Sequence, residues 1–197
     1  MLHGQAAMQP QVFIANGLPR LAILDRIRRH FDCSASQGND GDTVVSTQAK
    51  RKVLAVASGG GHWEQMMLLS PAFAGCDIVF ASTSARFVDP ALCPNFRVLS
   101  DTNRSSPLLA LKCLAQSVRL VFTERPDVIV STGALPGLLC IVAGTMTGAR
   151  TIWIDSLANS EKPSMCGKVA RHFVSRWYTQ WEHIARPGTH EYEGALL

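Results

Sequence analysis

Several familiar signatures are missing from this 197-residue sequence. Its six cysteines are scattered and include no C-x-x-C pair, which excludes a zinc or disulfide framework and favours reduced, buried thiols in a cytosolic protein. The first ten residues contain no basic segment followed by an apolar core, so they predict no secretory signal. The cysteines are Cys33, Cys76, Cys93, Cys113, Cys140 and Cys166.

Membrane spans, nucleic-acid patterns and metal motifs are missing as well. The uncharged run at 133–149 is broken by a proline and three glycines and is too short to cross a bilayer, so we expect a helix buried against a sheet. Basic and aromatic residues are not interleaved, which argues against nucleic acid as a partner. His172, His183 and His190 have no ligand-like spacing, so no metal is assigned.

What is present is an alternation of apolar strands and helices from residue 52 onward. This pattern predicts an α/β fold, a Rossmann-like parallel sheet with helices on both faces and ligands at the carboxyl ends of the strands. The expected strands are 53–57, 77–81, 97–99, 127–130 and 151–154, with a short one near 173–175, and the expected helices are 62–69, 107–122, 136–147 and 164–172.

Residues 1–50 differ from the domain expected at 51–197 and form an N-terminal extension. Within it, 18–31 has apolar residues at helical spacing surrounded by arginines, which predicts a basic amphipathic helix. Such a helix binds an anionic membrane or packs on the protein's own core, and the sequence leaves both open. The polar segment 32–50 is expected to be a flexible linker.

The most informative segment is the apolar run Val53–Ala57 followed by Ser58 and three glycines. The glycines let the chain turn tightly and leave the backbone open to a ligand. A helix starting near His62 would direct free N–H groups and its positive dipole end to the same point, which favours a phosphate or diphosphate. The alternative is that Gly59, Gly60 and Gly61 only make a tight turn.

Two common phosphate motifs do not fit this loop. No Gly-Lys-Ser/Thr follows, so it is not a P-loop, and Glu64 stands where the dinucleotide fingerprint needs its last glycine. His62 is the preferred general base because the pKa of an imidazole lies near operating pH. Glu64 is a further candidate acid or base, or simply a partner of the helix dipole.

Two more loops are expected at the same edge of the sheet. Ser131, Thr132 and Gly133 offer hydroxyl and N–H groups to an oxygen-rich ligand, or make a tight connection. Asp155 and Ser156 add a carboxylate and a hydroxyl. Asp155 would hold the tautomer of His62, bind sugar hydroxyls or cap the next helix.

Two segments away from this edge each have two possible roles. The leucines of 107–122 suit a core, while the nearby cations also suit acidic lipid headgroups. The aromatic residues of 177–197 predict a partner interface or a tail folded back over its own sheet.

In order along the chain, four segments resemble a known family: Ser-Gly-Gly-Gly-His-x-x-Gln at 58–65, Ser-Thr-Gly-Ala at 131–134, Ile-Asp-Ser-Leu-Ala at 154–158 and Phe-Val-Ser-Arg-Trp at 173–177. They are similar to the smaller, membrane-associated subunit of the split UDP-N-acetylglucosaminyltransferase that acts on dolichol-linked oligosaccharides. Bacterial relatives make capsular and exopolysaccharides. That family is similar in turn to the N-terminal half of GT-B glycosyltransferases, including the enzyme that adds N-acetylglucosamine to the lipid-linked peptidoglycan precursor.

The resemblance implies an acceptor-binding subunit that transfers a sugar from a UDP-sugar to a lipid-diphosphate-linked acceptor. A separate donor-binding subunit would be its partner, and no metal or other cofactor is expected. The sugar would be a hexose, an N-acetylhexosamine or glucuronic acid. Gly59, Gly60, Gly61 and Gln65 would bind the diphosphate, His62, Glu64 and Asp155 would be catalytic, and Ser131, Thr132, Gly133 and Ser156 would line the cleft.

The chain departs from the family at two points. Asp155 stands where glutamate is common, and the basic segment replaces the spanning helix of relatives from complex cells. The protein is therefore expected peripherally on the cytoplasmic face of the inner membrane. Two other functions stay open. One is a non-catalytic scaffold that recruits the donor-binding subunit. The other, a nucleotide-binding oxidoreductase, is weakened because 81–85 lacks the acidic residue that binds a ribose.

Overall fold

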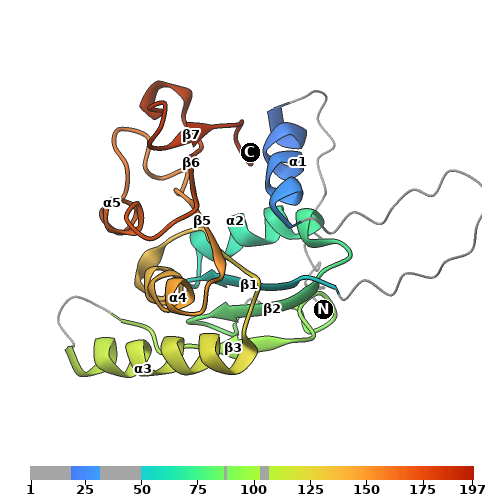
Figure 1. The fold of residues 1–197 in the computed structure, drawn as a ribbon, viewed down its shortest axis with the longest axis vertical. Helices are drawn as coiled ribbons and strands as arrows, with labels where there is room; N and C mark the ends of the chain where they lie inside the picture. The colour runs from blue at the N-terminus through green and yellow to red at the C-terminus, as the bar shows by residue number, and fades with distance from the viewer. Residues whose placement is uncertain (1–18, 32–49, 87, 103–106) are drawn as a thin grey trace, which may run out of the picture.

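A computed structural model describes residues 19–31, 50–86, 88–102 and 107–197. Its centre is a seven-stranded sheet in the order β3-β2-β1-β4-β5-β6-β7, in which every neighbouring pair runs parallel. Helices cover both faces of this sheet: in the view of Figure 1, α2 lies above the strands β1 and β2, and α3 lies below them. The predicted fold class is confirmed.

The elements follow one another in strand–helix alternation. The strands are β1 (Lys52–Ala57), β2 (Asp77–Ser82), β3 (Phe96–Val98), β4 (Val128–Ser131), β5 (Arg150–Ile154), β6 (Arg176–Thr179) and β7 (Glu191–Tyr192). The helices are α1 (Pro19–Phe31), α2 (Gly61–Leu69), α3 (Pro107–Glu124), α4 (Ala134–Met146) and α5 (Met165–Ala170), with 3-10 turns η1 (Ser70–Phe73) and η2 (Glu182–Ile184). Within the described residues, no helix is both long and apolar enough to span a membrane.

Two apolar cores lie on opposite faces of the sheet. Alternate residues of β1 divide between them: Val53 and Ala55 join the core under α1 and α2, and Leu54 joins the core under α3, α4 and α5. Burial on both faces explains why the strand is an uninterrupted apolar run rather than an alternating one.

The sixth strand is the main error of the sequence-based assignment. Residues 173–175, predicted as a strand, precede β6, which begins at Arg176 and pairs with β5. The strand β7 was not predicted at all. It has two residues and pairs with β6 through Tyr178↔Glu191 and Thr179↔Tyr192. The first five strands lie within one residue of their predicted bounds at each end.

The helix α1 packs on the core of the domain. Ile23, Ile27 and Phe31 are fully buried in the same cluster as β1 and α2. Nearby, Arg26 pairs with Glu193 at 3.3 Å. Of the two alternatives for this helix, the structure therefore shows packing on the protein itself. The predicted linker lies outside the described residues, and the division into 1–50 and 51–197 stays a prediction.

The C-terminal segment folds back onto the sheet. Trp177 and Tyr178 are buried in β6, and the indole of Trp177 stacks near the ring of His190 at 4.6 Å between centroids. Leu196 is fully buried in the core that α1 also joins. Trp177 and Tyr178 are core residues here, as in the second of the two alternatives for 177–197, while Trp181 and Tyr192 are half-buried.

The cysteine prediction needs a correction. Cys93, Cys113, Cys140 and Cys166 are free, as expected. Burial raises the pKa of the Cys140 thiol to about 12, so this group stays protonated. Cys76, however, is disulfide-bonded, so the prediction of six reduced thiols is wrong for this residue. The scattered spacing of the cysteines contains no signal for this bond. Cys33 lies outside the described residues.

The packing of α1 predicts a large effect of one truncation. Ile27→Ala should lower the free energy of unfolding by about 2–4 kcal/mol, because it leaves a cavity between α1 and the sheet. Arg28→Ala, at an exposed position on the same helix, should change it by less than about 0.5 kcal/mol. Urea unfolding followed by circular dichroism measures both. Equal small effects would mean that α1 is not part of the cooperative core.

Candidate functional site

The strand order places a crevice at the carboxyl ends of β1 and β4. These two strands are neighbours, but the chain leaves β1 for α2 on one face of the sheet and leaves β4 for α4 on the other. The loops that follow them therefore diverge, and this is the position where ligands bind in open parallel sheets. Residues 58–61 and 131–133 occupy it, as the sequence predicted.

The glycine loop after β1 has open backbone. Gly60 has φ +77° and caps α2 without a side-chain hydrogen bond. An added side-chain carbon at Gly60 or Gly61 would meet nothing within 4 Å, so a ligand can approach the peptide directly. Gly59 faces the loop after β2, where its N–H donates to Thr83 Oγ1 at 2.9 Å. The first turn of α2 thus presents its N–H groups to an open space, which suits an anion.

Two hydrogen bonds hold His62 against the loop after β4. Its Nδ1 lies 3.0 Å from the carbonyl oxygen of Thr132, and Thr132 Oγ1 donates to the carbonyl oxygen of His62 at 2.7 Å. A carbonyl only accepts, so Nδ1 carries the proton and Nε2 keeps its lone pair. Gly133 is needed beside them, because a side-chain carbon there would lie 2.5 Å from His62 Cε1.

The electrostatics of the site keep His62 neutral. Burial is the main cause that lowers its pKa below the ordinary 6.5, while the Thr132 carbonyl and the charge of Asp155 act in the opposite direction. The imidazole is therefore a neutral base at neutral pH, with Nε2 as the atom that can accept a proton.

The hydrogen bonds of the Asp155 carboxylate come from two indoles and a serine, and none comes from His62. The carboxyl group is buried, and Oδ1 accepts from Trp153 Nε1 at 2.9 Å and from Ser164 Oγ at 2.5 Å. Oδ2 accepts from Trp177 Nε1 at 3.1 Å. The partner of His62 is Thr132, so Asp155 does not hold its tautomer as one hypothesis proposed. Ser164, and not Asp155, caps α5.

Gln65 and Ser156 form part of a buried amide network. Gln65 Nε2 donates to Ser156 Oγ at 2.9 Å, and Gln65 Oε1 accepts from Leu157 N at 3.2 Å and Gln180 Nε2 at 2.8 Å. Most of the hydrogen-bonding capacity of Gln65 is thus used within the protein. Its prediction as a diphosphate ligand stays a prediction, and the geometry favours a positioning role.

These residues surround a pocket of about 410 Å³. One wall comes from α2 and the start of α4, and the other from the segment after β5 and the start of α5. Of the predicted residues, the lining includes Gly61, His62, Gln65, Gly133, Asp155 and Ser156. Sequence reasoning gave no individual role to the other lining residues, which are Ala134, Ala158, Asn159, Ser164, Met165 and Cys166.

Some predicted residues lie behind the pocket or outside it. Ser131 is buried under α4, with its Oγ accepting from Gly133 N at 3.1 Å, and Thr132 acts through its bonds to His62. Both shape the loop without lining the pocket. Glu64 is exposed on the first turn of α2 and does not line the pocket either.

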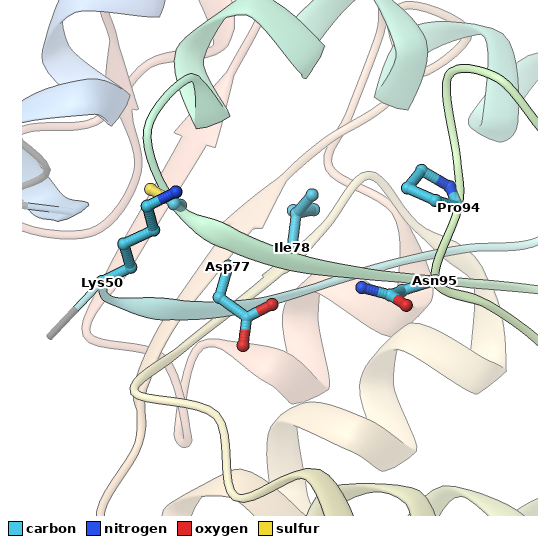
Figure 2. Close-up of a pocket in the computed structure, with 6 residues that line it drawn as sticks. Lys50, Asp77, Ile78, Pro94 and Asn95 are labelled. Atoms are coloured by element: carbon cyan, nitrogen blue, oxygen red, sulfur yellow. The ribbon is translucent and has the colours of Figure 1, made fainter.

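A second hollow of about 570 Å³ lies at the opposite edge of the sheet. Figure 2 shows its lining near the start of β2, with Lys50, Asp77 and Asn95 around it. It is larger than the first, yet it contains none of the residues predicted to act on a ligand. It lies at the amino ends of the strands, so we place the candidate site in the smaller pocket. Among the described residues, no cluster of three or more possible ligands suits a metal ion, and the absence of a cofactor stays a prediction.

Known proteins resemble this chain in sequence and in fold. No family model matches the chain. Over 111 residues the chain is 30% identical to the UDP-N-acetylglucosamine transferase subunit ALG14 of Yarrowia lipolytica, a match that covers 53% of this chain and 51% of that protein. The chain resembles this subunit. The resemblance inferred from the four segments is thereby confirmed, and the chain spans about half the length of the curated relative.

Solved structures give the same fold. MurG of Acinetobacter baumannii superposes on 72% of this chain and on 45% of the MurG chain, with a TM-score of 0.59 at 11% sequence identity. A glycosyltransferase from Rickettsia africae matches 75% of this chain and 43% of its own, with a TM-score of 0.53 at 11% identity. UDP-N-acetylglucosamine 2-epimerase from Rickettsia bellii matches with a TM-score of 0.59 at 11% identity, over 75% of this chain and 45% of its own. The fold is that of GT-B glycosyltransferase-like proteins, and the chain corresponds to less than half of each.

The contact between Gly133 and His62 makes a testable prediction. Gly133→Ala should cost about 2–4 kcal/mol of folding free energy, because it adds a clash with the imidazole to the strain of a φ of +139°. In a His62→Ala background the clash is gone, and the cost should fall to the backbone strain alone.

Gly148→Ala is the matched control, since Gly148 has φ +75° with nothing within 4 Å. Its cost should be about 1–2 kcal/mol in either background. Urea unfolding of the double-mutant cycle measures these values. A cost of Gly133→Ala that is independent of residue 62 contradicts the proposed contact.

Proposed function

We propose that this chain is the acceptor-binding subunit of a two-component glycosyltransferase in polysaccharide biosynthesis. It binds a lipid-diphosphate-linked acceptor, and a partner chain holds the UDP-sugar. The observation that carries the proposal is the neutral His62, fixed with Nε2 unprotonated, beside the open N-terminus of α2. A base next to an anion-binding loop suits transfer to a hydroxyl group of a diphosphate-bearing substrate.

The position of the pocket is compatible with a partner chain. Its lining comes from helices and loops at one edge of a single sheet. The relative from Yarrowia lipolytica is a UDP-N-acetylglucosamine transferase subunit. We therefore assign the nucleotide sugar mainly to a second chain that closes the crevice over His62.

The Nδ1–H tautomer of His62 leaves Nε2 able to accept a proton, and this defines the first step of the proposed transfer. His62 Nε2 takes the proton of an acceptor hydroxyl group, and the oxygen attacks the anomeric carbon of the donor sugar. The new carbon–oxygen bond forms as the bond to the β-phosphate oxygen breaks, and UDP leaves with that electron pair. The proton on His62 then passes to solvent. Asp155, in the lining of the pocket, assists by favouring the protonated imidazole that forms in this step.

The helix α3 offers a surface for the proposed attachment to the cytoplasmic face of the inner membrane. Its buried side includes Cys113 and Val121, while Leu108, Leu111 and Phe122 on the other side are exposed. The exposed residues Lys112 and Arg119 lie on that same outward side by helical spacing. Apolar side chains flanked by cations suit an anionic lipid surface. Because the apolar side of α1 is buried, we assign the contact to α3.

The transfer proposal predicts that activity appears with the partner and depends on His62. The chain alone should transfer no sugar from a UDP-sugar. In the reconstituted pair, His62→Ala should lower kcat by about 10²–10⁴-fold without weakening subunit assembly. The wild-type rate should hold near pH 7 and fall only on the acid side, below the ordinary imidazole pKa of 6.5, since protonation removes the base.

His172→Ala, at an exposed histidine away from the pocket, is the control. Transfer assays with a radiolabelled UDP-sugar and pull-down of the partner measure turnover and assembly separately. Unchanged turnover in His62→Ala supports the scaffold alternative. Full activity of the chain without a partner contradicts the two-component proposal.

The membrane proposal predicts that charge on α3 matters more than charge on α1. Lys112→Gln with Arg119→Gln should weaken binding to vesicles of phosphatidylcholine and phosphatidylglycerol by more than about tenfold, at about 1 kcal/mol per cation. Arg28→Gln with Arg29→Gln removes the same charge from α1 and should change binding little. Vesicle co-sedimentation at low and high salt measures both pairs. An equal loss in both pairs would point to net charge rather than to α3.

A further inference from the structure

Gln180 is a buried amide that no motif pointed to. It follows β6 directly and is 2% exposed. Its Nε2 donates to Gln65 Oε1 and to the carbonyl oxygen of Asp155, each at 2.8 Å. Its Oε1 accepts from the N–H of Leu196 at 3.1 Å. One side chain therefore joins α2, the end of β5 and the segment after β7.

The hydrogen bonds of Gln180 connect the two walls of the pocket. Gln65 lies three residues after His62, so the two side chains are on neighbouring turns of α2. Through Gln65, Gln180 also reaches the opposite wall, because Gln65 Oε1 accepts from Leu157 N and Gln65 Nε2 donates to Ser156 Oγ. The helix that carries His62 is thus tied to the wall that follows β5 through a pair of amides.

We propose that Gln180 is a positioning residue, which sets the distance between His62 on α2 and the pocket wall at 156–159. The inference rests on the proposed function, because the acceptor sugar would lie between these two walls. Gln180 acts through Gln65 and Asp155 and does not line the pocket itself.

The chemistry of an amide explains why glutamine suits this position. Both N–H groups are used by acceptors, and the oxygen is used by a donor, so all three parts of the side chain have partners. A carboxylate would place negative charge against two oxygen acceptors. An apolar side chain of the same length would leave the carbonyl of Asp155 and the N–H of Leu196 without these partners, which is costly for buried groups.

The test compares two changes at Gln180 with one at a distant glutamine. Gln180→Met removes all three bonds at similar length, and Gln180→Glu keeps the acceptor for Leu196 but loses both donors. The control is Gln116→Met, since Gln116 on α3 is half-buried and accepts from Ser100 N at 2.7 Å, away from the pocket. The full chain is used, and a thermal melt checks folding of each variant.

The first readouts need no substrate. In both Gln180 variants, amide exchange at Leu157 and Ala158 should speed up by about tenfold relative to the rest of the sheet, which corresponds to about 1.4 kcal/mol. The His62 ring, followed by NMR and assigned with His62→Gln, should titrate at a higher pH than in the wild type. Burial is the main cause that lowers the His62 pKa, so a pocket that admits more water should raise this pKa. Asp155 is the charged group that acts on the ring. Gln116→Met should move neither readout.

Three results would overturn the proposal. Unchanged exchange and His62 titration in folded Gln180 variants would mean that the amide does not set the pocket. The same changes in Gln116→Met would make them general effects of lost stability. Unfolding of both Gln180 variants would assign the residue to global stability instead of to positioning.

A second arm separates this inference from the proposed function. In a transferring pair of subunits, Gln180→Glu should lower kcat by about tenfold and leave the KM for the UDP-sugar unchanged, because the donor is held by the partner. If the NMR readouts move but no partner supports transfer, the proposed function fails and the positioning role stands. If transfer occurs and neither kcat nor the NMR readouts move, the positioning role fails alone.

Discussion

The reciprocal hydrogen bonds between His62 and Thr132 are the constraint on which the candidate site depends. Each residue donates a side-chain proton to the other's carbonyl, so the start of α2 is fixed to the loop after β4. The two loops otherwise diverge toward opposite faces of the sheet. Their connection fixes the imidazole tautomer, requires a glycine at 133 and holds the base beside the open N-terminus of α2.

The sequence predicted the parts of the site that follow from local chemistry. An apolar run followed by glycines and a histidine is sufficient to place His62 after β1, and the parallel sheet puts the loops after β1, β4 and β5 at one edge. The sequence could not show that Asp155 turns toward two indoles, or that Thr132 binds His62 through backbone oxygens. These partners lie on segments far apart along the chain, and their choice depends on tertiary packing.

The missed elements have the same cause. The strand β6 carries Trp177 and Tyr178, whose aromatic side chains suit a partner interface and a core equally well from composition alone. The position of Gln180 is invisible in a sequence, because a lone glutamine is usually a solvated surface residue. Asn159 follows the segment 154–158 and Cys166 lies in the short helix α5, and neither residue belongs to a motif that marks it as part of a site.

The central claim is that His62 is a neutral base with its Nε2 free, and its imidazole nitrogens report on this directly. Nitrogen-15 NMR of the ring, followed from pH 5 to 8, measures the tautomer and the pKa in the same experiment. The account predicts the Nδ1–H tautomer at pH 7 and a pKa below the ordinary 6.5, as burial dictates. An Nε2–H tautomer, or a ring that is charged at pH 7, would contradict it.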